Sequence, residues 1–283
     1  MISVIHQGLY TSIQDLGRFG YRSYGVPVSG AMDAISAGFG NALLNNHKND
    51  AVMEITMLGP KLEFTASTKI VLTGAEISPK LNQESIQNYK IYTVCAGDIL
   101  SFGALIKGVR CYLAVVDGFQ TPTVLKSKSF YGGITLKSIL LKNDKVLFKP
   151  NNEKIIEQNG ILNNKKQFYE TSILEVYKGP EFELFSNEEK EKLISTKLTV
   201  SNHINRMGYR LEEVVVAHDK SIITSSVLPG TVQLVPSGQL IVLMNDAQTT
   251  GGYPRVFQLT GKSIAILAQK KASDKINFVL VSI

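Results

Sequence analysis

Short apolar runs, rich in β-branched and aromatic residues, alternate along most of the chain with glycine, proline and polar residues. Runs of about four to eight residues at such close spacing favour a β-barrel or β-sandwich over a parallel α/β sheet. No run approaches the roughly 18 apolar residues that a membrane-spanning helix needs. The runs that we predict as strands are 61–67 (KLEFTAS), 68–76 (TKIVLTGAE), 90–94 (KIYTV), 98–103 (DILSFG), 109–116 (VRCYLAVV), 145–150 (KVLFKP), 231–235 (TVQLV), 239–245 (QLIVLMN), 263–269 (SIAILAQ) and 275–282 (KINFVLVS).

Helical periodicity occurs in two places. Residues 31–46 (AMDAISAGFGNALLNN) follow two candidate caps, Ser29 and Gly30, and place apolar residues at i, i+4 spacing. Residues 186–195 (SNEEKEKLIS) begin with Ser186, and Glu189 lies three residues further on. Because this pair has the spacing of a capping box, we predict a second short helix there.

A polar, Asn- and Lys-rich stretch at 151–170 divides the chain and predicts a linker or long loop. We therefore expect an N-terminal β subdomain at 1–155 and a C-terminal one at 170–283. Three sequence echoes in the same order indicate a diverged duplication: Arg-x-Gly-Tyr-Arg at 18–22 and 206–210, LGPKLEF (58–64) with KGPEFELF (178–185), and GDILSFG (97–103) with SDKINFV (273–279). The two Arg-x-Gly-Tyr-Arg copies are interpreted as the same turn in two related barrels.

Charge and cysteine usage exclude several classes of protein. The net charge is +6, but we interpret the lysines as spread thinly along the chain. Such a distribution does not favour nucleic-acid binding, which needs a basic surface patch. Cys95 and Cys111 lie in strand-like runs and are expected to be buried, reduced thiols. The histidines lack metal-ligand spacing, so we predict no metal site. The N-terminus lacks the basic and long apolar regions of a signal peptide, so the cytoplasm is expected.

Two segments, 11–33 and 244–256, concentrate polar residues and glycines. Four of the six arginines lie in the two Arg-x-Gly-Tyr-Arg copies, and arginine binds carboxylates with a planar, bidentate fork. Structural alternatives stay open at this point. Asp15 and Asp246 would cap turns, Arg18 and Arg206 would form ion pairs that fix a loop, and the two glycines at 251–252 would form a hairpin turn.

Several common catalytic motifs are missing from the sequence. TGKS at 260–263 lacks the glycine-rich cradle of a P-loop, and there is no G-x-S-x-G nucleophile elbow. The Ala-Met-Lys-Met motif that carries biotin is also absent, the nearest string being AMDA at 31–34. ATP or biotin chemistry would therefore not use its usual attachment motif in this chain.

Three blocks resemble the KipA-like family, also described as biotin-dependent carboxyltransferase-like or allophanate hydrolase subunit 2, which includes the C component (PxpC) of the ATP-dependent 5-oxoprolinase. They are GLYTSIQDLGRFGYRSYGVPVSGAMD (8–33), NRMGYRL (205–211) and LMNDAQTTGGYPR (243–255). The resemblance implies a mainly β fold of two cyclophilin-like β-barrel subdomains with a few short helices.

The same resemblance implies an enzyme subunit that is inactive alone and works with a KipI-like subunit (PxpB) and a LamB/YcsF-like subunit (PxpA). With ATP, such a complex hydrolyses 5-oxo-L-proline to L-glutamate. Two alternatives stay open: a regulatory protein that binds a KipI-like kinase inhibitor, and a carboxyltransferase component acting on urea- or allophanate-type substrates. In each enzymatic case the substrate carries a planar amide or ureido group.

The resemblance also implies site residues at the matching positions. The candidates for catalysis are Asp15, Arg18 and Asp246. We expect the first and third blocks to face one cleft between the subdomains, with Arg18 or Arg206 orienting a substrate carboxylate. The candidates for substrate binding are Tyr21, Ser29, Met32, Asp33, Arg206, Tyr209, Arg210, Gln248, Thr249, Thr250, Gly251, Gly252 and Tyr253.

Three positions depart from the family pattern. Lys128 replaces a frequent arginine, Ser225 stands where a carboxylate is expected, and Glu181 follows the Gly-Pro motif in place of Gln or His. These departures keep a regulatory role open beside the catalytic one.

Overall fold

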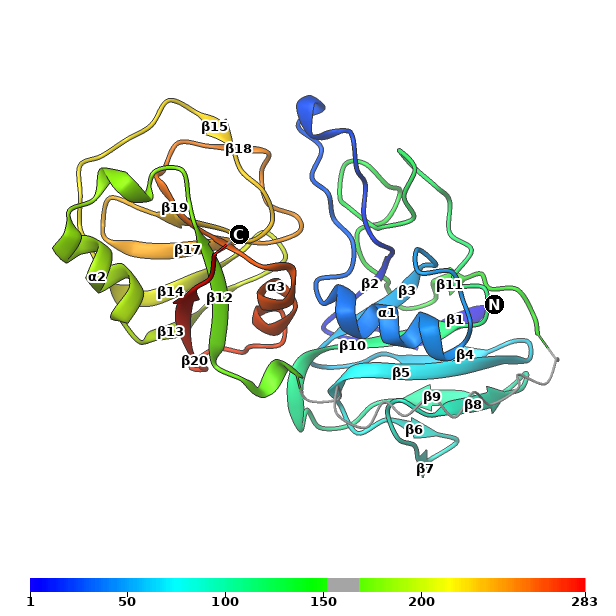
Figure 1. Cartoon of the computed structure of the whole chain (residues 1–283). Coiled ribbons are helices and arrows are strands. Elements are labelled where there is room, and N and C mark those ends of the chain that lie inside the picture. The colour runs from blue at the N-terminus through cyan, green and yellow to red at the C-terminus, as the bar shows by residue number, and fades with distance from the viewer. Residues whose placement is uncertain (152–167, 283) are drawn as a thin grey trace. The chain divides into compact units, whose positions relative to one another are not determined.

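The computed structural model describes residues 1–151 and 168–282, which form two compact units (Figure 1). Unit 1 comprises Met1–Phe19 and Ser29–Gln167, and unit 2 comprises Gly20–Val28 and Phe168–Ile283. A nine-residue segment of the N-terminal block therefore belongs by its contacts to the second unit. Most of the predicted linker at 151–170 lies outside the described residues.

Unit 1 is built from two antiparallel sheets. One has the strand order β11-β1-β4-β9-β6-β7 and the other β2-β3-β10-β5-β8. The first sheet contains β1 (Ile2–His6), β4 (Lys61–Phe64), β6 (Lys80–Leu81), β7 (Glu84–Ser85), β9 (Ile99–Ser101) and β11 (Lys145–Val146). The second contains β2 (Tyr10–Gln14), β3 (Val52–Thr56), β5 (Thr68–Glu76), β8 (Ile91–Val94) and β10 (Lys107–Val115).

The core of unit 1 lies between these sheets, because alternate residues of each strand point to the same side. Phe64 and Leu100 from the first sheet join Ile55 and Leu113 from the second in one fully buried cluster. The opposite face of the second sheet is covered by α1 (Ala34–Leu43), which packs on residues such as Tyr112. Both faces of this sheet are therefore buried.

Unit 2 contains a closed barrel with the strand order β12-β19-β16-β17-β14-β13-β20. Its strands are β12 (Ile173–Lys178), β13 (Leu198–Ile204), β14 (Gly208–Val214), β16 (Thr231–Leu234), β17 (Gln239–Leu243), β19 (Arg255–Leu259) and β20 (Lys275–Leu280). Alternation along a barrel strand sends every second side chain inward. Tyr209, Val232 and Val242 are fully buried in this way and fill the interior.

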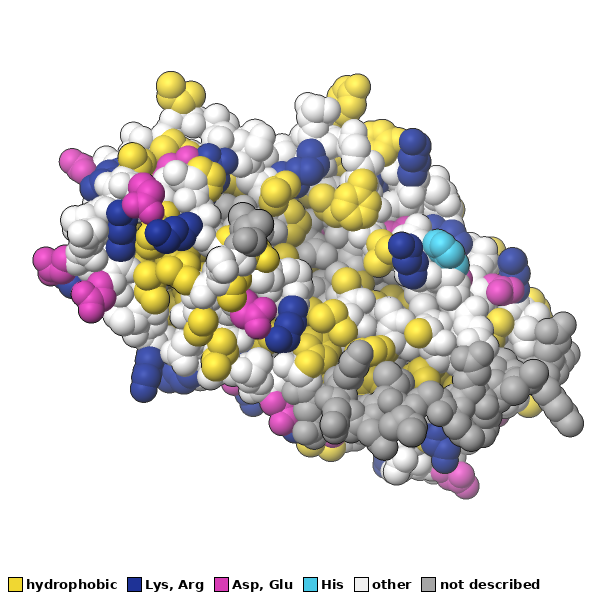
Figure 2. Space-filling view, in the orientation of Figure 1, with side chains coloured by type: hydrophobic (Ala, Val, Ile, Leu, Met, Phe, Trp, Pro, Cys, Tyr) yellow, Lys and Arg dark blue, Asp and Glu magenta, His cyan; other side chains and the backbone are white. Residues whose placement is uncertain are grey.

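Short elements surround the barrel. They are α2 (Asn187–Ser195), α3 (Gly261–Leu267), the two-stranded sheet of β15 (Ser225–Ser226) and β18 (Thr250–Gly251), and the single turns η1 (Arg22–Tyr24), η2 (Phe168–Glu170) and η3 (Phe182–Leu184). Figure 2 shows acidic and basic side chains side by side over α2, where Lys192 pairs with Glu188 at 2.8 Å. This helix therefore turns a charged face to solvent.

The mainly β prediction is confirmed, and the second unit supplies a closed barrel. Nine of the ten predicted strands overlap observed ones. The strand predicted at 263–269 is wrong, because α3 begins after Thr260, whose hydroxyl accepts a hydrogen bond from Ser263 N at 3.2 Å. The predicted capping box of α2 is present, but α1 is capped by Asp33, not by Ser29 or Gly30. Cys111 is buried as predicted, whereas the prediction that Cys95 is buried is wrong, because Cys95 lies exposed just after β8.

Two of the three sequence echoes do not share a local structure. The Gly-Pro echo is followed by strand β4 in one unit and by the turn η3 in the other. The first Arg-x-Gly-Tyr-Arg copy forms an irregular loop in which Gly20 has φ 89°, whereas the second forms a hairpin in which Gly208 begins β14. The interpretation of the two copies as one repeated turn is therefore wrong.

Candidate functional site: a polar pocket on the barrel wall

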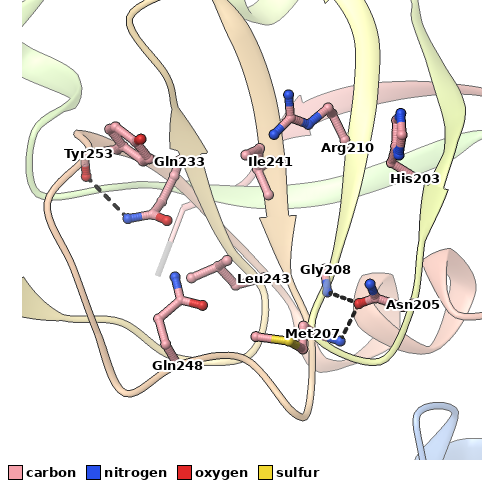
Figure 3. A pocket seen from close by; sticks show the side chains of 10 residues that line it. All are labelled: His203, Asn205, Met207, Gly208, Arg210, Gln233, Ile241, Leu243, Gln248 and Tyr253. Carbon is pink, nitrogen blue, oxygen red and sulfur yellow. Dashed lines mark hydrogen bonds between the residues drawn. The ribbon is translucent and has the colours of Figure 1, made fainter.

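A pocket with a volume of about 270 Å³ lies against the outer wall of the barrel in unit 2 (Figure 3). Drug-sized ligands occupy pockets of about 300–1,000 Å³, so this one suits a smaller, metabolite-sized molecule. Its polar side chains include carboxamides, a guanidinium, a phenol and an imidazole. The lining residues are His203, Asn205, Met207, Gly208, Arg210, Gln233, Ile241, Leu243, Gln248 and Tyr253.

Strand register places three of these residues in one row. Ile241 on β17 pairs with Arg210 on β14 and with Gln233 on β16. Their sequence neighbours Tyr209 and Val242 pair with each other and are fully buried in the interior, so the row lies on the outer face. The barrel thus fixes a guanidinium and a carboxamide on either side of an apolar side chain.

The hairpin between β13 and β14 forms the next wall of the pocket. The Asn205 side chain closes the turn, because its Oδ1 accepts hydrogen bonds from Met207 N at 2.7 Å and from Gly208 N at 3.1 Å. This is the geometry by which an asparagine side chain stabilises a tight turn. Asn205 therefore serves the turn first, although it also lines the pocket.

The remaining wall comes from the loop between β17 and β19, which carries Gln248 and Tyr253 on either side of β18. Figure 3 shows the carboxamides of Gln233 and Gln248 turned toward the same space across Leu243. Gln233 Nε2 also donates to the backbone oxygen of Tyr253 at 3.4 Å, which ties this loop to the barrel. Two amide groups on opposite sides can donate to and accept from one planar ligand.

Arg22 holds the sheet of β15 and β18 from its end. Its Nη2 donates to the backbone oxygens of Val227 and of Thr249, the latter at 3.2 Å. The same two residues are joined by a bond from Val227 N to Thr249 O at 3.1 Å. Partial burial lowers the pKa of Arg22 by desolvation. The Gly20–Val28 segment therefore fixes the position of the loop that carries Gln248.

Arg255 holds the same sheet from another side. Its Nη1 donates to Ser226 O at 2.8 Å, while Nε and Nη2 contact the Glu181 carboxylate at 2.8 and 2.6 Å. These hydrogen bonds lower the pKa of Glu181 and raise the pKa of Arg255. The departure from the family pattern at Glu181 thus has a structural role. Ser225, another departure, lies in β15 and pairs with Gly251.

Arg206 and Asp246 form a buried, bidentate ion pair behind the pocket. Arg206 Nε lies 2.7 Å from Asp246 Oδ2, and Nη2 lies 3.1 Å from Oδ1. Neither residue lines the pocket. The structural alternative for both residues, an ion pair that fixes a loop, agrees with this geometry. Arg206 is therefore engaged by a carboxylate of the protein, and its role in orienting a substrate carboxylate stays a prediction.

The other predicted residues of unit 2 fall into two groups. Arg210, Gln248 and Tyr253 line the pocket, and β18 with its neighbours at 249–252 lies beside it. Tyr209 is fully buried inside the barrel, so its position gives no support to a substrate-binding role. Tyr21 is half-buried, and its backbone oxygen accepts from Tyr24 N at 3.0 Å, as expected of a turn residue.

Asp15 lies in unit 1 at the centre of a cluster of hydrogen-bond donors. Its carboxylate accepts from Ser127 Oγ at 2.7 Å, Ser129 Oγ at 2.6 Å, Lys128 N at 2.6 Å and Gly17 N at 2.8 Å. A carboxylate offers about four lone-pair sites, so these donors occupy them. The geometry favours a role in fixing the loop around residue 128 over that of a catalytic base.

Arg18 serves the same loop. It is fully buried and donates from Nε to Val124 O at 3.3 Å and from Nη2 to Ser129 O at 2.6 Å. Lys128, the departure from the family arginine, donates from Nζ to Phe119 O at 3.0 Å. Arg18 is thus engaged within unit 1 by backbone oxygens, whereas Arg206 is engaged within unit 2 by a carboxylate.

Ser29, Met32 and Asp33 are buried in unit 1. Asp33 caps α1 through Ser36, and Met32 N donates to Glu54 Oε2 at 2.8 Å. Ser29 adopts φ 55°, and its Oγ has no hydrogen-bond partner among the described residues. None of the three belongs to the barrel pocket. The predicted cleft shared by the two halves stays a prediction, since the structure describes each unit by itself.

Sequence reasoning missed several pocket residues, most importantly Gln233. One signal was present: Gln233 is the polar residue of an otherwise apolar strand, TVQLV, and is only 2% exposed. Polar side chains in such positions need a specific partner or ligand. His203, Ile241 and Leu243 gave no such signal, because only the register between strands brings them together.

The protein is thus of the mainly β class, with a closed barrel in unit 2 and a polar pocket on the outer wall of that barrel. The chain belongs to the family of the carboxyltransferase domain, subdomain A and B, whose model matches residues 24–280. None of the helices in the described parts of the chain has the length and hydropathy of a membrane-spanning segment.

Similar proteins come from enzyme systems. The C component of the 5-oxoprolinase of Escherichia coli K12 is 33% identical, and that of Haemophilus influenzae 30%, each alignment covering 100% of this chain and 92% of the relative. The structure of the K. lactis urea amidolyase is 27% identical with a TM-score of 0.86, covering 99% of this chain but only 19% of that one. The first two relatives are single components of a larger enzyme, which implies a multi-subunit assembly.

Proposed function

We propose that this chain is the C component of an ATP-dependent 5-oxoprolinase, and that the barrel pocket binds the cyclic amide substrate. The observation that carries the proposal is the row of Arg210, Ile241 and Gln233, with Gln248 facing it across the pocket. 5-Oxo-L-proline is a small ring with one carboxylate and one amide. The pocket offers a guanidinium and two glutamine carboxamides around an apolar floor.

Each group has a role in this proposal. Arg210 binds the substrate carboxylate through two parallel hydrogen bonds, as arginine does wherever a planar anion is recognised. Gln233 and Gln248 donate to the amide oxygen and accept from the amide N–H. Ile241 and Leu243 pack on the ring. Holding the amide in a fixed orientation lowers the entropic barrier to attack on its carbonyl carbon.

Donors aimed at the amide oxygen have a second consequence. Opening the amide with ATP places negative charge on that oxygen, in a phosphorylated or tetrahedral intermediate. Fixed hydrogen-bond donors stabilise such charge without reorganisation. We assign no residue of this chain to ATP binding, and we propose only that the assembled complex binds ATP. The KipI-like (PxpB) and LamB/YcsF-like (PxpA) subunits are the proposed partners, and the cytoplasm is the proposed location.

The test is reconstitution with the two companion subunits, 5-oxo-L-proline and ATP, with glutamate as the measured product. The proposal expects glutamate from the full complex and none from this chain alone. No glutamate from an intact, assembled complex would contradict it. Assembly with the KipI-like subunit alone, without any glutamate, would favour the regulatory alternative.

The likeness to the urea amidolyase structure favours a second candidate, a carboxyltransferase acting on urea. Two carboxamides suit a ureido group equally well, but urea has no carboxylate for Arg210 to bind. Binding of urea and of 5-oxo-L-proline to the Arg210→Met variant therefore separates the two. The first candidate is supported if Arg210→Met loses 5-oxo-L-proline binding while urea binds weakly to both proteins. The second is supported if urea binds tightly and with the same affinity to the wild type and to the variant.

A further inference from the structure

A second cavity lies in unit 1 and shares no residue with the barrel pocket. Its volume is about 690 Å³, well within the range of about 300–1,000 Å³ that small organic ligands occupy. Its walls are mostly apolar and include Phe130, Ile134, Leu140 and Val146. We call it the lysine-rimmed pocket, because Lys137 and Lys145 also line it.

The walls of this pocket are fixed by the sheets of unit 1. Phe130 N donates to Ile13 O at 2.8 Å, and Leu140 N donates to Thr11 O at 2.7 Å, which attaches the long loop after β10 to β2. Val146 pairs with Ile2 of β1. Phe130, Leu140 and Val146 also belong to the buried core cluster. The pocket is therefore an opening in a packed core with walls that are already formed.

One polar atom close to the pocket has no hydrogen-bond partner among the described residues. Thr121 Oγ1 is buried, and no described residue forms a hydrogen bond with it. A buried hydroxyl without a partner loses its bonds to water and is uncommon in folded proteins. Because this oxygen has almost no accessible surface, even toward the cavity, it is packed behind the wall and does not reach a ligand.

The rim is positively charged. Residues 119–149 contain six lysines and one aspartate, in a chain whose total net charge is +6. The interpretation of the lysines as spread thinly is therefore wrong for this segment. Lys137 pairs with Asp144, but no carboxylate of the described residues pairs with Lys145, which is exposed. The rim thus has an unneutralised cation beside an apolar cavity.

We propose that the lysine-rimmed pocket binds a small organic anion with an apolar body, such as a medium-chain or aromatic carboxylate. The apolar body lies against Phe130, Leu140 and Val146, and the anionic group reaches Lys145 at the rim. The site is separate from the barrel pocket, so this proposal stands or fails independently of the proposed function.

The test uses the full chain and octanoate as the probe, titrated by calorimetry, with 1-octanol as the uncharged counterpart. The fluorescent anion anilinonaphthalene sulfonate, displaced by octanoate, gives a second readout. We expect one saturable site that octanol occupies more weakly. Ile134 is a half-buried residue of the pocket wall, and the larger side chain of Ile134→Trp should fill the cavity and abolish octanoate binding. Near-ultraviolet circular dichroism verifies that this variant is folded.

The charge at the rim is tested with a pair of lysine variants. Lys145→Gln should weaken octanoate binding about five-fold, as expected for one exposed ion pair, and leave octanol unchanged. The matched control is Lys142→Gln, an exposed lysine of the same loop that does not line the pocket.

Three outcomes would overturn the proposal. They are wild-type binding by Ile134→Trp, equal losses in Lys145→Gln and Lys142→Gln, and octanol binding as tightly as octanoate. A fourth result would also overturn the proposal and would indicate binding to a lipid surface. In that case the wild-type chain and Ile134→Trp would sediment equally with anionic phosphatidylglycerol vesicles.

Discussion

Arg206 and Asp246 join the tip of the β13–β14 hairpin to the loop after β17. Besides the bidentate ion pair, Asp246 N donates to Arg206 O at 2.9 Å, so three hydrogen bonds connect the two residues. Both side chains are more than nine-tenths buried. Since both elements line the barrel pocket, this pair supports the pocket without touching it.

Removing one partner of this pair should be more damaging than removing both. We expect Asp246→Asn to lower the free energy of unfolding by about 3–5 kcal/mol, because it leaves the Arg206 guanidinium buried without its counter-charge. The double variant Arg206→Met with Asp246→Leu should lose less free energy of unfolding, because it leaves no unpaired charge buried. Urea unfolding of the chain measures both. An Asp246→Asn protein of wild-type stability that no longer forms glutamate in the complex would instead indicate a catalytic role.

Arg22 should control the order of the loop that carries Gln248. Arg22→Lys keeps the charge but loses the two-sided donation to Val227 and Thr249. We expect faster hydrogen exchange at Val227 N, whose acceptor is Thr249 O, and an unchanged rate in the strands of unit 1. Equal exchange at Val227 in the two proteins would show that the clamp does not stabilise the loop.

Two adjacent glycines provide a matched pair of variants. A Cβ on Gly251 would come 2.5 Å from Gln233 Nε2, whereas the nearest atom to a Cβ on Gly252 is Ile222 O at 3.7 Å. Gly251→Ala should therefore displace the Gln233 carboxamide and raise the KM for 5-oxo-L-proline about ten-fold, as expected for one lost hydrogen bond. Gly252→Ala should leave KM unchanged. The same KM in both variants would exclude Gln233 from substrate binding.

The Glu181–Arg255 pair should make stability depend on acid pH. The folded state lowers the pKa of Glu181, mainly through hydrogen bonds from Arg255. Its contribution is therefore present above the unfolded pKa of about 4.3 and disappears as pH falls through the folded value. The stability difference between wild type and Glu181→Gln should shrink between about pH 5 and pH 3. A difference that stays constant over this range would contradict the assignment.

Elements are predictable from the sequence where local chemistry determines them. Ser186 and Glu189 specify α2 by their own hydrogen bonds, and the run 68–76 is the observed strand β5. The run 263–269 is not predictable in this way, because a short, continuously apolar segment has no period that separates strand from helix. The Thr260 cap decides between the two, and it lies inside the TGKS string.

The site was harder to predict, since it depends on register and on pairing between distant residues. Arg210 and Gln248 lie in the motif blocks, but Gln233 reaches them only through Ile241 on the strand between. The presence of an arginine in the sequence does not tell whether it binds a carboxylate of a ligand or one of the protein. The structure pairs Arg206 with Asp246 and leaves Arg210 on the pocket wall.

The most direct test of the barrel pocket is the KM for 5-oxo-L-proline of complexes that contain Arg210→Met. Losing a charge-assisted, bidentate contact should raise KM by about ten-fold or more. The charge-matched control is Lys192→Met on the exposed surface of α2, which should behave as wild type. We expect a large rise in KM for Arg210→Met with the complex intact, and a KM equal to that of the control would show that Arg210 does not bind the substrate.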